Sequence, residues 1–276
     1  MLRQPTGFMH LKVVHAVMMS VFVVVVGIAA AVHEPRIAAN PVLSGDVVVF
    51  YPEHPDDEVL WGGSAIRSAL ETKGASNVYV VLVSRGLGAT PFTRTAEYAA
   101  LTSDQKGQLR ENEFLAAMRA LGVERANIIV LRDPKPGFDD SFVQMRETAL
   151  RLERSAASEG KTVTHVAHSY KYDDNAAHRA NGQVIKTLLD QGLIRDALFW
   201  IKPQYRLRIP AAEMVKFQAL TPADSAAVHS AIDTYETSDP RAGLEAVGYR
   251  ATPWYFAVLG WDKYLTSALH TAAVPG

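Results

Sequence analysis

A histidine and three carboxylates stand directly after an apolar run, in the stretch His54-Pro55-Asp56-Asp57-Glu58. Proline favours the first position of a helix, and acids in the first turn complement the helix dipole, so the stretch could simply start a helix. That interpretation does not explain His54, nor a second histidine, His178, later in the chain. The residue types also suggest a metal site, and local spacing alone leaves both interpretations open.

A catalytic zinc ion takes about three nitrogen or oxygen ligands and keeps one position open. His54 and Asp57, three residues apart across a turn, can face one point, and His178 can supply the third ligand. Asp56, between the first two, could reach a water without binding the metal. A magnesium site for phosphoryl chemistry is the weaker interpretation, because Mg²⁺ prefers oxygen ligands whereas histidines suit zinc.

These side chains need a scaffold, and β-rich runs alternate with helical patterns along the chain. The pattern predicts strands over residues 46–51, 77–84, 127–133, 162–169 and 197–202. It predicts helices over about 56–73, 102–121, 140–158 and 178–191, one more from residue 221, and an apolar, aromatic tail over 253–266. Such alternation indicates an α/β, Rossmann-like three-layer fold, with a mainly parallel sheet flanked by helices.

Ligands of such sheets bind outside the carboxyl ends of the strands. His54 follows the first predicted strand, and His178 lies beyond the fourth, at the start of the next helix. Both histidines are therefore expected at the ligand-binding edge of the sheet.

The stretch HPDDE after a first strand resembles the motif of the LmbE/PIG-L family of zinc-dependent N-acetylglucosaminyl deacetylases. Further likenesses are the loop SRGLGA after the second strand, Arg110 and Glu113 in the next long helix, and His178 followed by Arg-Ala. The resemblance covers roughly residues 46 to 190. It implies a Zn²⁺-dependent hydrolase that removes an acyl group, expected to be acetyl, from an amino sugar or glycoconjugate.

The resemblance also implies roles for single residues. His54, Asp57 and His178 would bind zinc, Asp56 would be the general base that activates the metal-bound water, and Arg110 would hold hydroxyls of the sugar. The roles suit amide hydrolysis, because zinc lowers the pKa of a bound water to about 7 and the tetrahedral oxyanion needs stabilisation.

One sub-site departs from the family pattern. The family shows His-x-x-His with an aspartate just before the second histidine, whereas this chain has Asn175-Ala176-Ala177-His178. Asn175 can donate a hydrogen bond to an oxyanion but cannot deliver a proton at neutral pH. A catalytically degenerate member that binds a glycan or a metal outside the cell is therefore the alternative, and the intact Asp56 argues against it.

Other candidates carry weaker signals. His168, at the end of the fourth strand, could be a substitute acid or a plain strand-end residue. Tyr172 and Asp173, in the following loop, could contact substrate, and Arg85 could line the sugar pocket. Solvation of the loop already explains Tyr172 and Asp173, and the turn chemistry of Gly86 and Gly88 accounts for the segment of Arg85. The run Trp254-Tyr255-Phe256 is expected in the core.

Composition narrows the classes of protein. The 276 residues are 48% hydrophobic and 21% charged, which suits one globular domain. A formal net charge of -1 gives no electrostatic footprint for nucleic acid, so we expect no such partner. The absence of cysteine excludes disulfides, thiolate metal ligands and cysteine nucleophiles.

The N-terminal sequence is unusually apolar. Residues 13–32 contain only His15 and Ser20 as polar side chains, after a basic lead and before any acid. This pattern is typical of an export signal, and about twenty apolar residues can also span a bilayer. We predict a signal peptide or membrane anchor plus linker over residues 1–44 and a deacetylase-like domain over 45–276, secreted or anchored outside the cytoplasm. A buried helix is the alternative, but it would not explain the charge asymmetry.

Overall fold

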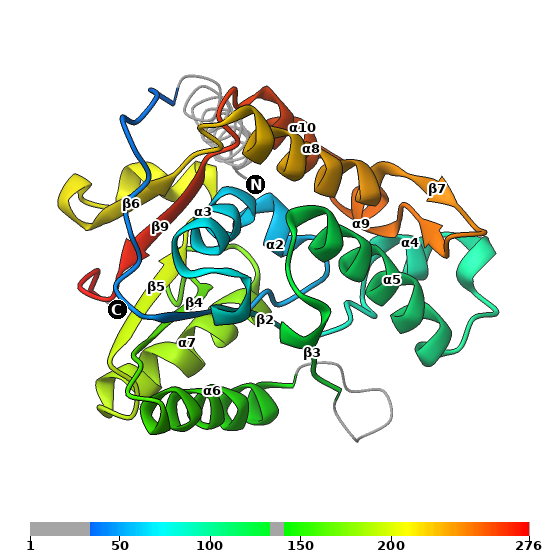
Figure 1. Cartoon of the computed structure of the whole chain (residues 1–276). Coiled ribbons are helices and arrows are strands. Elements are labelled where there is room, and N and C mark those ends of the chain that lie inside the picture. Colours follow the sequence, from blue (N-terminus) through cyan, green and yellow to red (C-terminus); the bar gives the residue numbers. More distant parts are fainter. Residues whose placement is uncertain (1–33, 133–140, 276) are drawn as a thin grey trace, which may run out of the picture.

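A seven-stranded sheet forms the centre of the computed structural model, which describes residues 34–132 and 141–275 (Figure 1). The strand order is β3-β2-β1-β4-β5-β9-β6. Strands β1 to β5 are parallel, whereas β9 is antiparallel to both β5 and β6. The strands are β1 (Val47–Phe50), β2 (Val78–Leu82), β3 (Ile128–Val130), β4 (Val163–His168), β5 (Asp196–Trp200), β6 (Met214–Phe217) and β9 (Ser267–Thr271). The predicted α/β fold with a mainly parallel sheet is confirmed.

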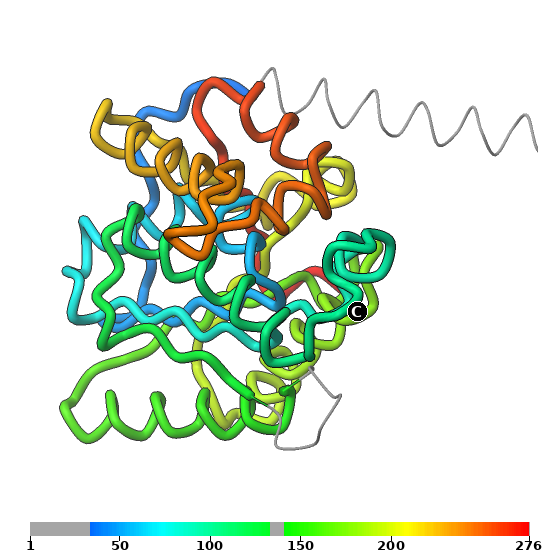
Figure 2. The backbone as a smooth tube through the Cα atoms, turned by 90° about the vertical axis from the view of Figure 1, so that its right-hand side faces the viewer, coloured from blue at the N-terminus to red at the C-terminus, as the bar shows by residue number. Residues whose placement is uncertain are grey.

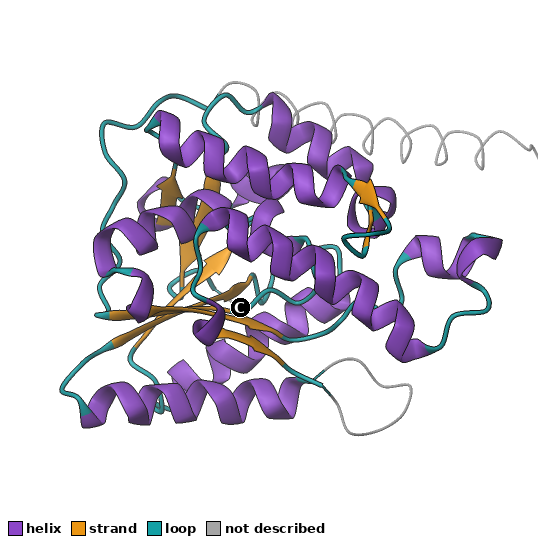
Figure 3. Ribbon diagram, turned by 45° about the vertical axis from the view of Figure 1, so that its right-hand side comes forward, coloured by secondary structure: helices purple, strands orange, loops and turns teal. Residues whose placement is uncertain are grey.

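Helices cover both faces of this sheet (Figure 3). The helices are α2 (Asp57–Leu60), α3 (Gly63–Lys73), α4 (Thr90–Arg94), α5 (Ser103–Leu121), α6 (Phe142–Ser158), α7 (Ala176–Asp190), α8 (Pro222–Glu236), α9 (Val247–Ala251) and α10 (Pro253–Trp261). A short hairpin, β7 (Ser238–Asp239) and β8 (Leu244–Glu245), separates α8 from α9. Helices α3, α5 and α8 cover one face of the sheet, and α6 and α7 cover the other.

Alternation along β1 creates the two cores. Val48 and Phe50 pack with α3, α5 and α8, whereas Val47, Val49 and Tyr51 pack with α6 and α7. Successive side chains of a strand point to opposite faces, so a continuous apolar run serves a strand that is buried on both sides.

The position of β1 and β4 locates the site. The two strands are neighbours in the sheet, and from them the chain order runs outward in both directions. Loops leaving such a pair diverge and open a crevice beyond the carboxyl ends of the strands. The segments after β1 and β4 are those that carry His54 and His178.

Two expectations about elements are corrected. The helix predicted over 56–73 is split, because α2 ends at Leu60 and α3 begins at Gly63. A Cβ at Gly62, in the break, would lie 2.6 Å from the ring of Trp200, so the chain needs a glycine there. The tail predicted over 253–266 is not all core: α10 exposes Trp254, whereas Phe256 is buried.

Residues 34–44, expected to act as a linker, lie against the body. The Glu34 carboxylate pairs with Arg206 at 3.1 Å and with Lys216 at 2.7 Å. Gln218 binds the backbone of Ile37 and Pro35. The apolar run over residues 13–32 lies outside the described residues, and among the described residues no helix has the length and apolar character of a membrane span.

Candidate metal and active site

A cavity of about 570 Å³ opens at the carboxyl edge of the parallel strands. Its floor is formed by segments that follow β1, β2, β4 and β5, and its outer wall by residues 88–90 and by residues 251–255, from α9 to α10. The cavity volume lies within the range of about 300–1,000 Å³ that is usual for small-molecule sites.

Three ligand-type atoms meet at the cavity wall. His54 Nδ1 lies 3.1 Å from His178 Nε2 and 3.4 Å from Asp57 Oδ2, and His178 Nε2 lies 3.3 Å from Asp57 Oδ2. Ligand atoms about 2.0–2.1 Å from a tetrahedral zinc ion lie roughly 3.3 Å from one another. Two imidazoles and a carboxylate at this spacing therefore fit a zinc ion. The structure brings together the three residues that the sequence suggested as ligands.

Asp57 is fixed by several neighbours besides the two histidines. Its Oδ1 accepts a hydrogen bond from Trp61 Nε1 at 2.8 Å, and its Oδ2 accepts one from the backbone N–H of His54 at 2.8 Å. Burial raises the pKa of Asp57, but His178 and His168 outweigh burial and hold the pKa well below its ordinary value. The carboxylate is therefore ionised, as a metal ligand must be.

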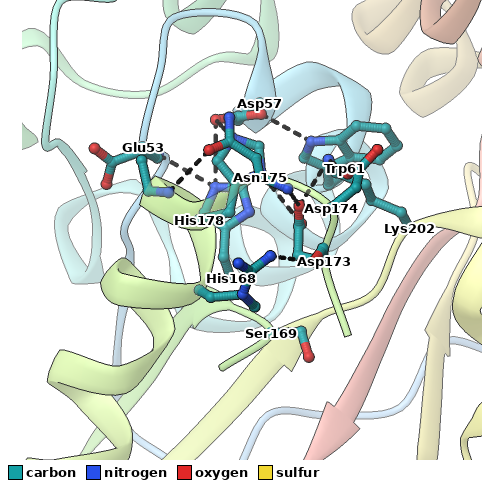
Figure 4. Close-up of polar contacts among 12 residues, drawn as sticks. Glu53, Asp57, Trp61, His168, Ser169, Asp173, Asp174, Asn175, His178 and Lys202 are labelled. Carbon is teal, nitrogen blue, oxygen red and sulfur yellow. Dashed lines mark hydrogen bonds and ion pairs between the residues drawn. The ribbon is translucent and has the colours of Figure 1, made fainter. Parts of the chain in front are cut away.

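The orientation of His178 is set from behind by Asp173 (Figure 4). Its Nδ1 lies 3.1 Å from Asp173 Oδ2, and Lys202 Nζ holds Asp173 Oδ1 at 2.8 Å. A proton on Nδ1 that is donated to Asp173 leaves the Nε2 lone pair for a metal. Burial lowers the pKa of His178, but Asp57 and Asp173 outweigh it and raise the pKa to about 10. Without metal the cluster thus holds a proton, which metal binding must displace.

Asp56 is held in a strained conformation beside these atoms. Its φ of 113° is one that residues with a side chain rarely adopt. Arg110 Nη2 donates to Asp56 Oδ2 at 2.9 Å and also to the Pro55 carbonyl, while the Asp56 N–H donates to Glu58 Oε2 at 3.0 Å. Burial raises the pKa of Asp56 to about 6, and Arg110 limits the rise. A pKa near neutrality suits a general base.

Arg110 lines the cavity while being only 2% exposed. Its Nη1 lies 3.1 Å from Glu113 Oε2, and Glu113 accepts the backbone N–H groups of Val247 and Gly248, at the start of α9. One arginine thus connects the motif after β1 with the C-terminal wall of the cavity. Its expected contact with sugar hydroxyls stays a prediction.

Asn175 caps α7 at the edge of the cavity. Its Oδ1 accepts the backbone N–H of Ala177 at 2.9 Å, and the helix begins at Ala176, two residues before the predicted start. Because the cap uses Oδ1, the NH₂ group is the part of this amide that can donate to a bound substrate.

His168, suggested as a substitute acid, and Tyr172, suggested as a substrate contact, do not face the cavity. His168 is 1% exposed, stacks on His178 with ring centroids 4.0 Å apart, and directs Nε2 to Asp57 Oδ2 at 3.3 Å. Burial and His178 lower the pKa of His168 to about 4, so it is neutral near pH 7. The Tyr172 ring is in contact with the cations of Lys171 and Arg208, and Tyr172 is not part of the cavity lining. Both expectations are corrected on these grounds.

Two suggested substrate contacts also lie elsewhere. The Arg85 side chain turns to Asp104, at 3.2 Å, and packs over Gly107, while its neighbours Ser84 and Gly86 line the cavity. Asp173 lies beneath the site and contacts His178 and Lys202. Asp173 is therefore placed to orient His178 and not to contact a substrate.

Sequence reasoning missed Trp61, Lys202 and Tyr255, all of which line the cavity. Lys202 closely follows β5, so its place at the ligand edge was a usable signal. Trp61 lies four residues after Asp57, one turn further along the chain. Tyr255 donates to Asp174 Oδ2 at 3.2 Å, and no local pattern around it indicates this contact.

Solved structures with similar folds include two deacetylases. An N,N'-diacetylchitobiose deacetylase from Pyrococcus horikoshii has 17% sequence identity and a TM-score of 0.51, over 82% of this chain and 84% of that one. The antimicrobial reagent A40926 pseudoaglycone deacetylase has 15% identity and a TM-score of 0.54, over 82% of this chain and 96% of that one. At these identities the likeness shows a shared fold. No curated protein matches the sequence.

The family model described as PIG-L, GlcNAc-PI de-N-acetylase, matches residues 48–189, slightly more than half of the chain. The match spans the segments after β1 and β4 that carry His54, Asp57 and His178. The chain belongs to the PIG-L family.

Proposed function

We propose that this protein is a zinc-dependent hydrolase that removes an N-acyl group, expected to be acetyl, from an amino sugar or glycoconjugate. Membership of the PIG-L family and the deacetylases among the similar folds support a deacetylase function. The observation that carries the proposal is the meeting of His54, Asp57 and His178 at one point of the cavity wall.

His54 Nδ1, Asp57 Oδ2 and His178 Nε2 would hold the zinc ion, and Asp173 would keep His178 in the required orientation. When bound, zinc supplies Lewis acidity to the acyl carbonyl and makes a water acidic near neutral pH. The donor set favours zinc over magnesium because two of the three ligands are imidazoles.

Asp56 takes the proton of the attacking water, since its carboxylate lines the cavity next to the ligand set. As the new C–O bond forms and the C–N bond breaks, Asp56 returns this proton to the amine nitrogen. Arg110 keeps the Asp56 carboxylate in place through the 2.9 Å contact. The Asn175 NH₂ group donates to the oxyanion, where a neutral amide offers a dipole but no full charge.

A panel of N-acetylated sugars and glycans tests the proposal, with the purified, zinc-loaded chain and detection of free amine. The wild type should release amine from at least one compound, and Asp56→Asn should release little while binding the same compound. If the zinc-loaded wild type binds glycans but releases no amine from any of them, the protein is a glycan-binding member of the family and the hydrolase proposal fails.

We also propose that the body of the protein lies outside the cytoplasm, either secreted or anchored. The basic lead and the apolar run over residues 13–32 support this location. Protease added to intact cells or spheroplasts should degrade the body. Full protection of the protein, together with its recovery in the cytosolic fraction, would contradict export.

A further inference from the structure

An exposed tryptophan pair stands on the outer face of α10. Trp254 is 44% exposed and Trp261 is 48% exposed, and their rings meet edge to face with centroids 5.6 Å apart. The helix contains no charged residue, and its inner face buries Phe256, Val258 and Leu259. Large aromatic side chains exposed together usually mark a contact surface.

The described chain begins close to this helix. Glu34 pairs with Arg206, which lies within the 3₁₀ segment Pro203–Arg208, and Arg206 donates to the Thr266 carbonyl at 3.0 Å. Arg206 also lines a small pocket together with Val258 and Leu259 of α10. Glu34 is therefore one arginine side chain away from the inner side of α10. Figure 2 shows the first described residues crossing the segment that follows α10.

The sequence before Glu34 places the end of the apolar run close to Glu34. The apolar run ends at Val32, two residues before Glu34, and its roughly 20 residues match the thickness of a bilayer. One residue spans at most about 3.6 Å, so two residues keep Glu34 within about 7 Å of the end of the run. If the run enters a bilayer, the surface of the body around Glu34 must face that bilayer.

We propose that the Trp254–Trp261 face of α10 docks on the surface of the lipid bilayer that the N-terminal run enters. Tryptophan favours the headgroup level of a membrane, where its ring meets apolar chains and its N–H meets water. The proposal rests on the anchored form of the location proposed above and is independent of the hydrolase chemistry. Tyr255, on the same helix, lines the cavity, so docking would bring one cavity wall close to the membrane.

Quenching of tryptophan fluorescence tests the docking. The full chain is reconstituted in phosphatidylcholine vesicles with or without lipids brominated near the headgroup end of the acyl chain. Wild-type emission should fall with brominated lipid, and Trp254→Tyr/Trp261→Tyr should lose this sensitivity. The two tryptophans that remain in the variant, Trp61 and Trp200, are only 6% and 2% exposed.

A matched control places a tryptophan on the far side of the sheet. Val143, on α6, is 68% exposed, and α6 and α10 lie on opposite sides of the molecule (Figure 1). Val143→Trp, added to the double tyrosine variant, should give emission that brominated lipid does not quench. Equal quenching of this variant and the wild type would overturn the proposal, because lipid contact would then not be specific to α10.

Flotation of the vesicles separates the remaining outcomes. If the full chain floats with the vesicles but its emission is no more quenched than that of the double variant, another surface or another segment covers the tryptophan pair, and the docking proposal is wrong. If the chain does not float, the apolar N-terminal run does not enter the bilayer. The docking proposal is then wrong, because it depends on that run. Neither result bears on amine release by the zinc-loaded protein, so the hydrolase proposal is tested separately.

Discussion

Arg110 Nη2 lies 2.9 Å from Asp56 Oδ2, and the same guanidinium also bonds the Pro55 carbonyl and Glu113. Asp56 has a φ of 113°, which costs free energy unless its surroundings hold it. One arginine thus supports both the strained backbone and the carboxylate of the proposed base. The planar guanidinium can make these contacts together because it presents several donors in a fixed plane.

Replacing Arg110 by lysine should misplace the base without removing the metal. A lysine ammonium carries the charge but cannot reproduce three contacts in one plane, so kcat should fall by roughly 10-fold or more while zinc stays bound. Arg85→Lys, at an arginine outside the cavity, should leave kcat near wild type. Equal kcat values for the two variants would show that Arg110 does not position Asp56. Zinc content and steady-state kinetics measure both effects.

Asp173 should strengthen metal binding without touching the metal. Its Oδ2 lies 3.1 Å from His178 Nδ1, and loss of such a support usually weakens a metal site by about 10- to 100-fold. Asp173→Asn should therefore bind zinc more weakly by that factor in a competition with a chelator. The control is Asp174→Asn, because Asp174 also contacts Lys202 but no ligand. Similar losses of zinc affinity in both variants would show that the weaker binding comes from a change in the loop and not from the lost contact with His178.

The missing helper histidine can be restored by mutation. Neither His168 nor Tyr172 faces the cavity, so we expect that neither side chain replaces the helper histidine. Any effect of His168→Ala on kcat should therefore not come from the loss of a catalytic acid. Asn175→His with Ala177→Asp should raise kcat, because a charged imidazolium stabilises an oxyanion better than an amide does. Asn175→His alone should do less, since it loses the α7 cap and lacks an orienting carboxylate. A double variant no faster than wild type would show that position 175 does not stabilise the oxyanion.

The candidate metal cluster could be predicted from the sequence because the geometry of a parallel sheet is simple. Carboxyl ends of neighbouring parallel strands meet at one edge, so residues after β1 and β4 had to approach each other. The predicted start of the helix over 102–121 also agrees with the structure, because Thr102 caps α5 and forms a capping box with Gln105.

Other features of the site could not be predicted from local sequence patterns. Whether Asp173 faces the cavity or the back of His178 depends on Lys202, which comes from a different strand end. The wall around Tyr255 comes from a C-terminal segment where the family likeness has ended. Trp254 was expected in the core because α10 is apolar on all sides, and an apolar run alone does not show which side faces outward.

His270, in β9, should make the fold sensitive to acid. Burial lowers its pKa to about 4, whereas an unfolded histidine has a pKa of about 6.5. Between these values the unfolded chain binds a proton that the folded chain does not. The contribution of His270 to stability is therefore complete above about pH 6.5 and is lost as the pH falls toward about 4, by at most about 3 kcal/mol. Urea unfolding at a series of pH values measures the loss.

A His270→Asn variant should show a smaller loss of stability over this pH range than the wild type. His229→Asn, at an exposed histidine of α8, should lose as much stability as the wild type. If His270→Asn and the wild type have the same pH dependence, His270 is not the group responsible.

We propose that Asp57 binds the metal whereas its neighbour Asp56 performs proton transfer. Zinc content and amine release, measured on the same preparations of wild type, Asp56→Asn and Asp57→Asn, test it directly. The wild type and Asp56→Asn should each bind roughly one zinc ion per chain, Asp57→Asn should lose most of its zinc, and Asp56→Asn should release amine about 100-fold more slowly or worse. Full zinc occupancy in Asp57→Asn, or wild-type amine release by Asp56→Asn, would contradict the assignment.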